Sequence, residues 1–100
     1  MIIMDLTVVP VGTGSASLSA YVAGVQKALE EAGFEPHLHS MGTTIEAETI
    51  ERALEAVKVV HNYPFSQGAV RVVTAVKIDE RRDKEGSIGQ KMKSVEEKLS

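Results

Sequence analysis

The chain has 100 residues, of which 43% are hydrophobic, 25% charged and 4% aromatic, and its formal net charge is -3. This length suits one domain, residues 1–100, with an aliphatic core. The acidic balance offers no broad attraction to nucleic acid or anionic lipid, and the absence of cysteine excludes disulfides, thiolate metal sites and thiol nucleophiles.

Residues 2–11 predict a central β-strand, because polar and apolar residues alternate along a β-branched run. Asp5 and Thr7 share one parity. The other parity holds Ile2, Met4, Leu6 and Val8. The run lacks a basic region before it and contains Asp5, so we expect neither a signal peptide nor a membrane span, and a cytoplasmic protein is the default expectation.

Residues 18–32 predict an amphipathic helix that ends at Gly33. The preceding GTGSAS turn has the glycines of a phosphate-binding loop but neither GxGxxG nor GK[ST]. We therefore interpret Ser15 or Ser17 as a helix cap. In the functional alternative, Thr13 or Ser17 would hydrogen-bond a ligand near the end of the first strand.

Residues 34–41 and 43–48 predict two strands joined at Gly42. His37 and His39 stand two residues apart, a spacing that two metal ligands on one side of a strand can use. Supporting carboxylates are not obvious nearby, so we expect surface or interface histidines and no metal site.

Residues 50–63 predict a second helix, with Thr49 as its N-cap and Glu51 near the positive end of its dipole. Its expected buried stripe is Ile50, Ala53, Leu54, Val57 and Val60. We expect the helix to stop around residues 61–63, before Pro64, which would place His61 beside free carbonyl groups.

The stretch AVRVVTAVKIDERR predicts the clearest strand. One face carries Val70, Val72, Thr74, Val76 and Ile78, and the other carries Arg71, Val73, Ala75, Lys77 and Asp79. The charge run that follows, residues 79–85, fits a solvated loop or ion pairs between subunits. Ser87 and Gln90 match a capping box that opens a final helix. Its apolar stripe is Ile88, Met92, Val95 and Leu99.

The order β-α-β-β-α-β-α predicts an α+β domain, a ferredoxin-like βαββαβ sandwich with an additional C-terminal helix. Helices should cover one face of the sheet. The other face should be half apolar and half polar, and such a surface calls for a partner sheet or a ligand. The final helix is a second candidate for packing against a neighbouring subunit. On the open face, Arg71 is expected to pair with Asp5, to meet a ligand, or to form a buried pair across an oligomer interface.

Three stretches, VVPVGTGSASLSAYV, HSMGTTIEAE and RVVTAVKIDERRD, together resemble the thiamine-binding protein family over essentially the whole chain. The resemblance implies ferredoxin-like subunits that pair through their sheets, often into tetramers as dimers of dimers. It also implies binding of thiamine or its hydroxymethylpyrimidine part without known chemistry. Family hairpins commonly read like TTVEGE, whereas this chain has Ala47 where glycine is usual.

Thiamine is a cation with an aminopyrimidine ring, so a receptor needs polar groups for the ring nitrogens and amine, apolar surface for the ring faces, and an acidic residue near the thiazolium. The candidate ligand-binding residues are Thr7, Thr13, Ser17, Thr43, Thr44, Glu46 and Arg71, with Asp5 as a further polar neighbour. The plain structural alternative is that threonine favours strands and glutamate solubilises a sheet edge.

An enzyme would need a nucleophile or base with an orienting partner, and no spacing in the sequence links Ser, His and Asp in that way. We therefore expect a small-molecule binder without a cofactor, acting as a carrier, buffer or sensor. The alternative is a structural or regulatory assembly module whose sheet face serves only subunit pairing.

Overall fold

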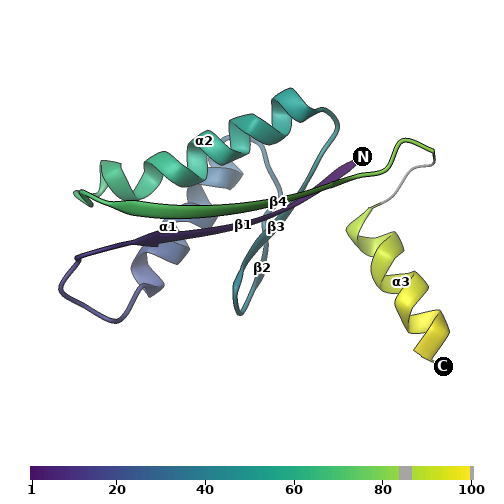
Figure 1. Cartoon of the computed structure of the whole chain (residues 1–100), viewed down its shortest axis with the longest axis horizontal. Helices are drawn as coiled ribbons and strands as arrows, with labels where there is room; N and C mark the ends of the chain where they lie inside the picture. Colours follow the sequence, from purple (N-terminus) through teal and green to yellow (C-terminus); the bar gives the residue numbers. More distant parts are fainter. Residues whose placement is uncertain (84–86, 100) are drawn as a thin grey trace.

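The computed structural model describes residues 1–83 and 87–99 (Figure 1). Its elements follow the predicted order. They are β1 (Ile2–Pro10), α1 (Ser19–Glu31), β2 (His37–His39), β3 (Gly42–Ala47), α2 (Ile50–Ser66), β4 (Val72–Glu80) and α3 (Ile88–Leu99).

The strands form one antiparallel sheet in the order β2-β3-β1-β4, with Leu6 of β1 opposite both Thr43 and Val76. Helices α1 and α2 pack on each other and cover one face, while α3 extends away from the end of the sheet (Figure 1). The ferredoxin-like α+β fold with an additional C-terminal helix is thus confirmed.

The core lies between the sheet and the two helices. Alternation along β1 directs Ile2, Met4 and Leu6 to the helix side, where each is at most 2% exposed. Their buried partners are Val25, Leu29, Phe34, Ile45, Ala47, Ala53, Ala56 and Val60. This arrangement leaves Ile3, Asp5 and Thr7 on the opposite face, as the pattern predicts.

Helix α2 is longer than predicted, because it runs through Pro64 to Ser66. Thr49 caps it as predicted, its Oγ1 accepting the Arg52 N–H at 3.1 Å. Pro64 falls in the last turn, where its ring is fully buried and its carbonyl accepts the Gln67 N–H at 3.0 Å. The missing N–H of proline therefore costs a single hydrogen bond near the helix end, and burial of the ring offsets it.

His61 consequently lies inside α2 and not at its C-terminus. Its Nδ1 is 2.8 Å from the Thr74 Oγ1 of β4, and its ring meets Phe65 edge-on. The predicted contact with free helix carbonyls is wrong. The histidine instead ties α2 to β4.

Two predictions around α1 are also wrong. Among the described residues, no side chain caps the helix at Leu18; the Ser15 Oγ accepts the Ser17 N–H at 3.1 Å within the preceding turn instead. Strand β2 is shorter than residues 34–41, because the chain first wraps the end of α1, with the Phe34 N–H donating to the Leu29 carbonyl at 2.9 Å.

The apolar face of β4 is assigned correctly but is not fully covered. Val76 and Ile78 are each 41% exposed, although they share the helix side with Leu6 and Met4. Leu54 of α2, predicted as buried, is 49% exposed. β4 is an edge strand, and α2 is the helix that contacts it. The helix side of β4 is therefore only partly covered by other side chains.

Local ion pairs follow β4. Arg82 Nε donates to Glu80 at 2.8 Å and Arg81 Nε to Asp83 at 2.5 Å. The hydrogen bond from Arg82 lowers the pKa of the Glu80 carboxyl. These contacts lie within one exposed segment, and the rest of the predicted charge run, residues 84–85, lies outside the described residues.

Helix α3 begins as predicted, with Ser87 Oγ accepting the Gln90 N–H at 3.1 Å. Its apolar residues Met92, Val95 and Leu99 are all more than half exposed. Within the described part of the chain, no helix has the length and apolarity needed to cross a membrane.

Candidate ligand-binding site

A cavity of about 360 Å³ opens between the start of α1, the end of β1 and the tip of the β2–β3 hairpin. We call it the hairpin cavity. Its apolar walls come from Leu6, Val8, Val9, Leu18, Val22, Val25, Leu38, Met41 and Val60, and its other lining residues are Thr7, Gln26, His39, Ser40, Gly42 and Thr43. Mostly apolar walls with few polar groups are typical of small-molecule sites, and this volume is near the lower end of their range.

Thr43 is the most buried polar residue of this wall, with 4% exposure. It points to the helix side of the sheet, as Leu6 opposite it does. There its Oγ1 accepts a hydrogen bond from Gln26 Nε2 at 2.7 Å. A polar pair joining α1 to β3 therefore lies inside a mostly apolar wall.

Thr44 points to the opposite face, because successive residues of a strand alternate. Its Oγ1 donates to Asp5 Oδ1 at 3.1 Å, and His39 Nε2 lies 2.6 Å from the same oxygen. His39 Nδ1 accepts the Met41 N–H at 3.2 Å, so the imidazole hydrogen is on Nε2 and donates to Asp5. The two threonines, predicted as one site, are thus separated by the sheet.

The turn between β2 and β3, which forms the rim of the hairpin cavity, contacts β1 directly. Thr7 Oγ1 donates to the Met41 carbonyl at 3.1 Å. Gly42 approaches β1 so closely that a Cβ there would lie 2.7 Å from the Leu6 carbonyl oxygen. The hairpin turn requires a residue without a side chain at this position, and Thr7 holds the turn against the cavity mouth.

Thr13 and Ser17 lie in the exposed turn before α1 and bond locally. Thr13 Oγ1 donates to the Ser15 carbonyl at 3.1 Å, and Ser17 Oγ lies 3.5 Å from Ser19 Oγ. Neither is among the residues that line the hairpin cavity. Their role in ligand binding stays a prediction.

Arg71 does not pair with Asp5. Asp5 faces Lys77 across the β1–β4 ladder, and Arg71 stands six positions before Lys77, roughly 20 Å away at ~3.4 Å per residue. The Arg71 carbonyl accepts the Val11 N–H at 2.8 Å at the far end of β1. The expected pairing is wrong because shared parity fixes the face of a residue and not its distance.

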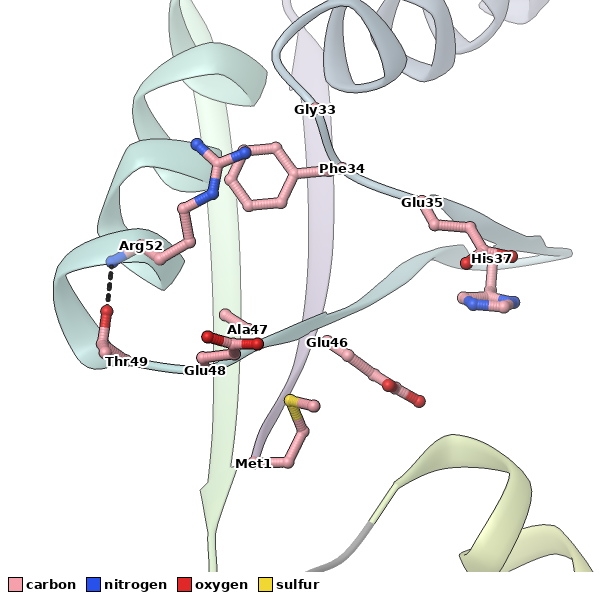
Figure 2. A pocket seen from close by; sticks show the side chains of 10 residues that line it. All are labelled: Met1, Gly33, Phe34, Glu35, His37, Glu46, Ala47, Glu48, Thr49 and Arg52. Atoms are coloured by element: carbon pink, nitrogen blue, oxygen red, sulfur yellow. Dashed lines mark hydrogen bonds between the residues drawn. The ribbon is translucent and has the colours of Figure 1, made fainter.

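Glu46 lines a second cavity, of about 540 Å³, at the other end of β3 (Figure 2). We call it the Arg52 cavity. Its remaining lining residues are Met1, Gly33, Phe34, Glu35, His37, Ala47, Glu48, Thr49 and Arg52. Figure 2 shows Glu46 pointing away from Arg52, toward α3. Its Oε1 accepts the Ile88 N–H at 2.8 Å, the first amide of α3.

Arg52 also has partners within the protein. Its guanidinium stacks on the Phe34 ring at 3.8 Å (Figure 2). It also donates to the Ala32 carbonyl and to Glu55 Oε2, both at 2.6 Å. Since Arg52 and Glu46 both have protein partners, the larger cavity is the weaker candidate for a ligand. Among residues 1–83 and 87–99, no group of three His, Asp or Glu is placed to hold a metal ion.

The chain matches the family described as thiamine-binding protein over residues 4–96. The chain belongs to this family. A UPF0045 protein of Methanothermobacter thermautotrophicus is 43% identical over 99 residues, covering 99% of this chain and 100% of the relative. The UPF0045 protein YqgV of Bacillus subtilis is 41% identical over 103 residues, covering 99% and 98%.

Solved structures confirm the fold. The hypothetical protein MJ1052 of Methanocaldococcus jannaschii aligns with a TM-score of 0.83 at 32% identity, covering 96% of each chain. A Thermotoga maritima protein with a provisional assignment to thiamine biosynthesis or salvage has a TM-score of 0.76, covering 94% of this chain and 97% of its own. At 22% identity, this second likeness supports the fold alone.

Gln26 is a polar residue of the hairpin cavity that reasoning from the sequence missed. The available signal was its position one residue after Val25 and four after Val22, within the apolar stripe of α1. Ala47, which stands where family hairpins usually have glycine, is 4% exposed and packs in the core opposite Ile2. Its methyl group therefore faces the helices and lies outside the hairpin cavity lining.

Proposed function

We propose that this protein binds thiamine or its hydroxymethylpyrimidine part without catalysing a reaction, and acts as a cytoplasmic carrier, buffer or sensor. The observation that carries the proposal is the hairpin cavity, an apolar space with Gln26 and Thr43 in its wall, in a chain of the thiamine-binding family.

The lining chemistry fits a flat heteroaromatic ring. Leu18, Val22 and Val8 supply apolar surface for the ring faces, and Thr43 with Gln26 supplies polar atoms for ring nitrogens or an amine. Thr7 stands at the rim, near the part of a ligand that remains outside. Of the residues that the sequence pointed to, Thr7 and Thr43 are the two that line this space.

We further propose a homo-oligomer in which subunits pair through their open sheet faces, as a dimer of dimers. Val73 on that face is 52% exposed, and Val9 opposite it is 36% exposed. The exposed stripe of α3 adds a second apolar surface at the end of the same sheet. Apolar groups arranged in this way favour association over exposure to water.

The test is isothermal titration of the purified protein with thiamine, hydroxymethylpyrimidine and thiamine phosphate, with light scattering to count subunits. We expect saturable binding at a fixed stoichiometry per subunit in an oligomer. Comparing the three affinities identifies the recognised part and shows whether a phosphate helps or hinders. The absence of heat and of any thermal shift with all three would contradict the proposed ligand.

A second candidate function is a structural or regulatory assembly module without a small-molecule ligand. The specific observation in its favour is the exposure of Val73 together with Met92, Val95 and Leu99, which assembly alone would explain. A stable oligomer that ignores all three compounds would support it. A ligand-responsive oligomer would exclude it as the whole account.

A further inference from the structure

Gln26 has one half of its amide satisfied and the other half free. Its Nε2 donates to Thr43 Oγ1 at 2.7 Å. Its Oε1 is buried and, within the described part of the chain, has no hydrogen-bond partner. Buried acceptors are nearly always paired, so an unpaired one beside a cavity needs an explanation.

A ligand N–H group supplies the missing partner. A donor that reaches a desolvated carbonyl gains more than one bonding to an exposed carbonyl, since the free protein already bears the cost of the unpaired oxygen. Because Thr43 takes the Nε2 end, the amide is oriented as an acceptor for a ligand. The wall therefore favours a ligand that presents an N–H over one that presents a carbonyl oxygen.

The charges around the hairpin cavity decide which part of the ligand enters. Among the described residues that line it, none is Asp, Glu, Lys or Arg. The titratable residue there is His39, whose Nε2 hydrogen is directed to Asp5. A permanent cation inside would lose its water without gaining a counter-charge, whereas a neutral ring would not.

We propose that the hairpin cavity takes the neutral aminopyrimidine end of the ligand, with its exocyclic amine donating to Gln26 Oε1, and leaves the thiazolium cation outside in water. This inference rests on the proposed function and names the half of the ligand that is buried. It makes Gln26 the residue that selects an amine over an oxygen at that position of the ring.

The experiment compares thiamine with oxythiamine, in which a carbonyl oxygen replaces the exocyclic amine, by titration into wild-type protein, Gln26→Met and Gln67→Met. Gln26→Met keeps the side-chain length and removes the acceptor. Gln67 follows α2, is exposed and lines neither cavity described above, so Gln67→Met is the matched control.

We expect wild-type protein and Gln67→Met to prefer thiamine by about tenfold or more, the value of one buried hydrogen bond. In Gln26→Met, thiamine should bind roughly tenfold more weakly and the preference should disappear. Hydroxymethylpyrimidine, which carries no cation, should compete for the same site in wild-type protein.

Equal or tighter binding of oxythiamine to wild-type protein would overturn the inference while the proposed function stood. The same holds for thiamine binding that hydroxymethylpyrimidine fails to displace. The wild-type comparison needs no variant, so it decides the question even if Gln26→Met folds poorly. Absence of binding by all three compounds would overturn the proposed function itself, and this inference with it.

Discussion

Thr43 and Thr44 are adjacent in the chain, but their hydroxyl groups are used on opposite faces of the sheet. Thr43 Oγ1 accepts from Gln26 on the helix side at 2.7 Å, whereas Thr44 Oγ1 donates to Asp5 on the open side at 3.1 Å. Substitutions at the two positions should therefore have separable effects, although each removes one hydroxyl.

We expect Thr43→Val to reduce the stabilisation that thiamine gives and to lower the free energy of unfolding by about 1–3 kcal/mol, because the buried Gln26 amide loses its partner. Thr44→Val should keep the ligand response and change stability by less than ~1 kcal/mol, since Asp5 retains His39. Thermal unfolding of both variants with and without thiamine checks this. Loss of the response in Thr44→Val alone would move the site to the open face.

Glu46 should matter for α3 more than for a ligand. Glu46→Ala removes the acceptor of the Ile88 N–H, and we expect a loss of about 0.5–2 kcal/mol of local helix stability. Hydrogen exchange at the amides of residues 88–92 should become faster. Glu48→Ala, on the same cavity but one residue past β3, is the control and should leave those amides unchanged.

Gly24 is required by the packing of α1 on α2. A Cβ at this position would overlap the Tyr63 ring and hydroxyl, with the hydroxyl oxygen only 1.9 Å away. Gly24→Ala should destabilise the protein by ~1–3 kcal/mol despite the better helix propensity of alanine. Urea unfolding of Gly24→Ala, Tyr63→Ala and the double variant measures this coupling.

The control for that series is Gly89→Ala in α3, where no atom of the described residues lies within 4 Å of the added methyl group. It should be neutral or slightly stabilising. If Gly24→Ala behaves in the same way, Tyr63 does not restrict the approach of the helices. If the double variant loses as much free energy of unfolding as the two single variants together, Gly24 and Tyr63 are not coupled.

Val73→Asp tests the open face as a subunit interface. Burying an unpaired carboxylate between two sheets is strongly unfavourable, so the oligomer should dissociate. Val70→Asp, at an 88% exposed position before β4, is the matched control and should leave the mass unchanged. Light scattering distinguishes the outcomes, and an oligomer indifferent to Val73→Asp would place the interface elsewhere.

Alternation and caps predicted most of the fold. The parity of Asp5 and Thr7, the cap at Thr49 and the cap at Ser87 all have the predicted geometry. These features depend on neighbours a few residues away, so the sequence contains them directly. The helix continues through Pro64 because its ring gains burial in the last turn, which a general rule about helix ends does not include.

The candidate site was harder to predict, since it depends on distances across the fold. The pattern placed Arg71 and Asp5 on one face but could not show that register separates them. It did not distinguish the Thr43 hydroxyl and the Glu46 carboxylate from the polar groups beside them, although Thr43 contacts Gln26 and Glu46 contacts α3. Gln26 was overlooked because its role arises from a contact seventeen residues away.

Strand β3 contributes to the hairpin cavity at one end and to the contact with α3 at the other. Thr43 stands beside the hairpin cavity, and Glu46 holds the first amide of α3. Changes around Thr43 can alter the cavity lining while Glu46 keeps its contact with α3, and changes around Glu46 can alter the attachment of α3 while the cavity persists. The lining of the cavity and the attachment of α3 can therefore change independently of each other.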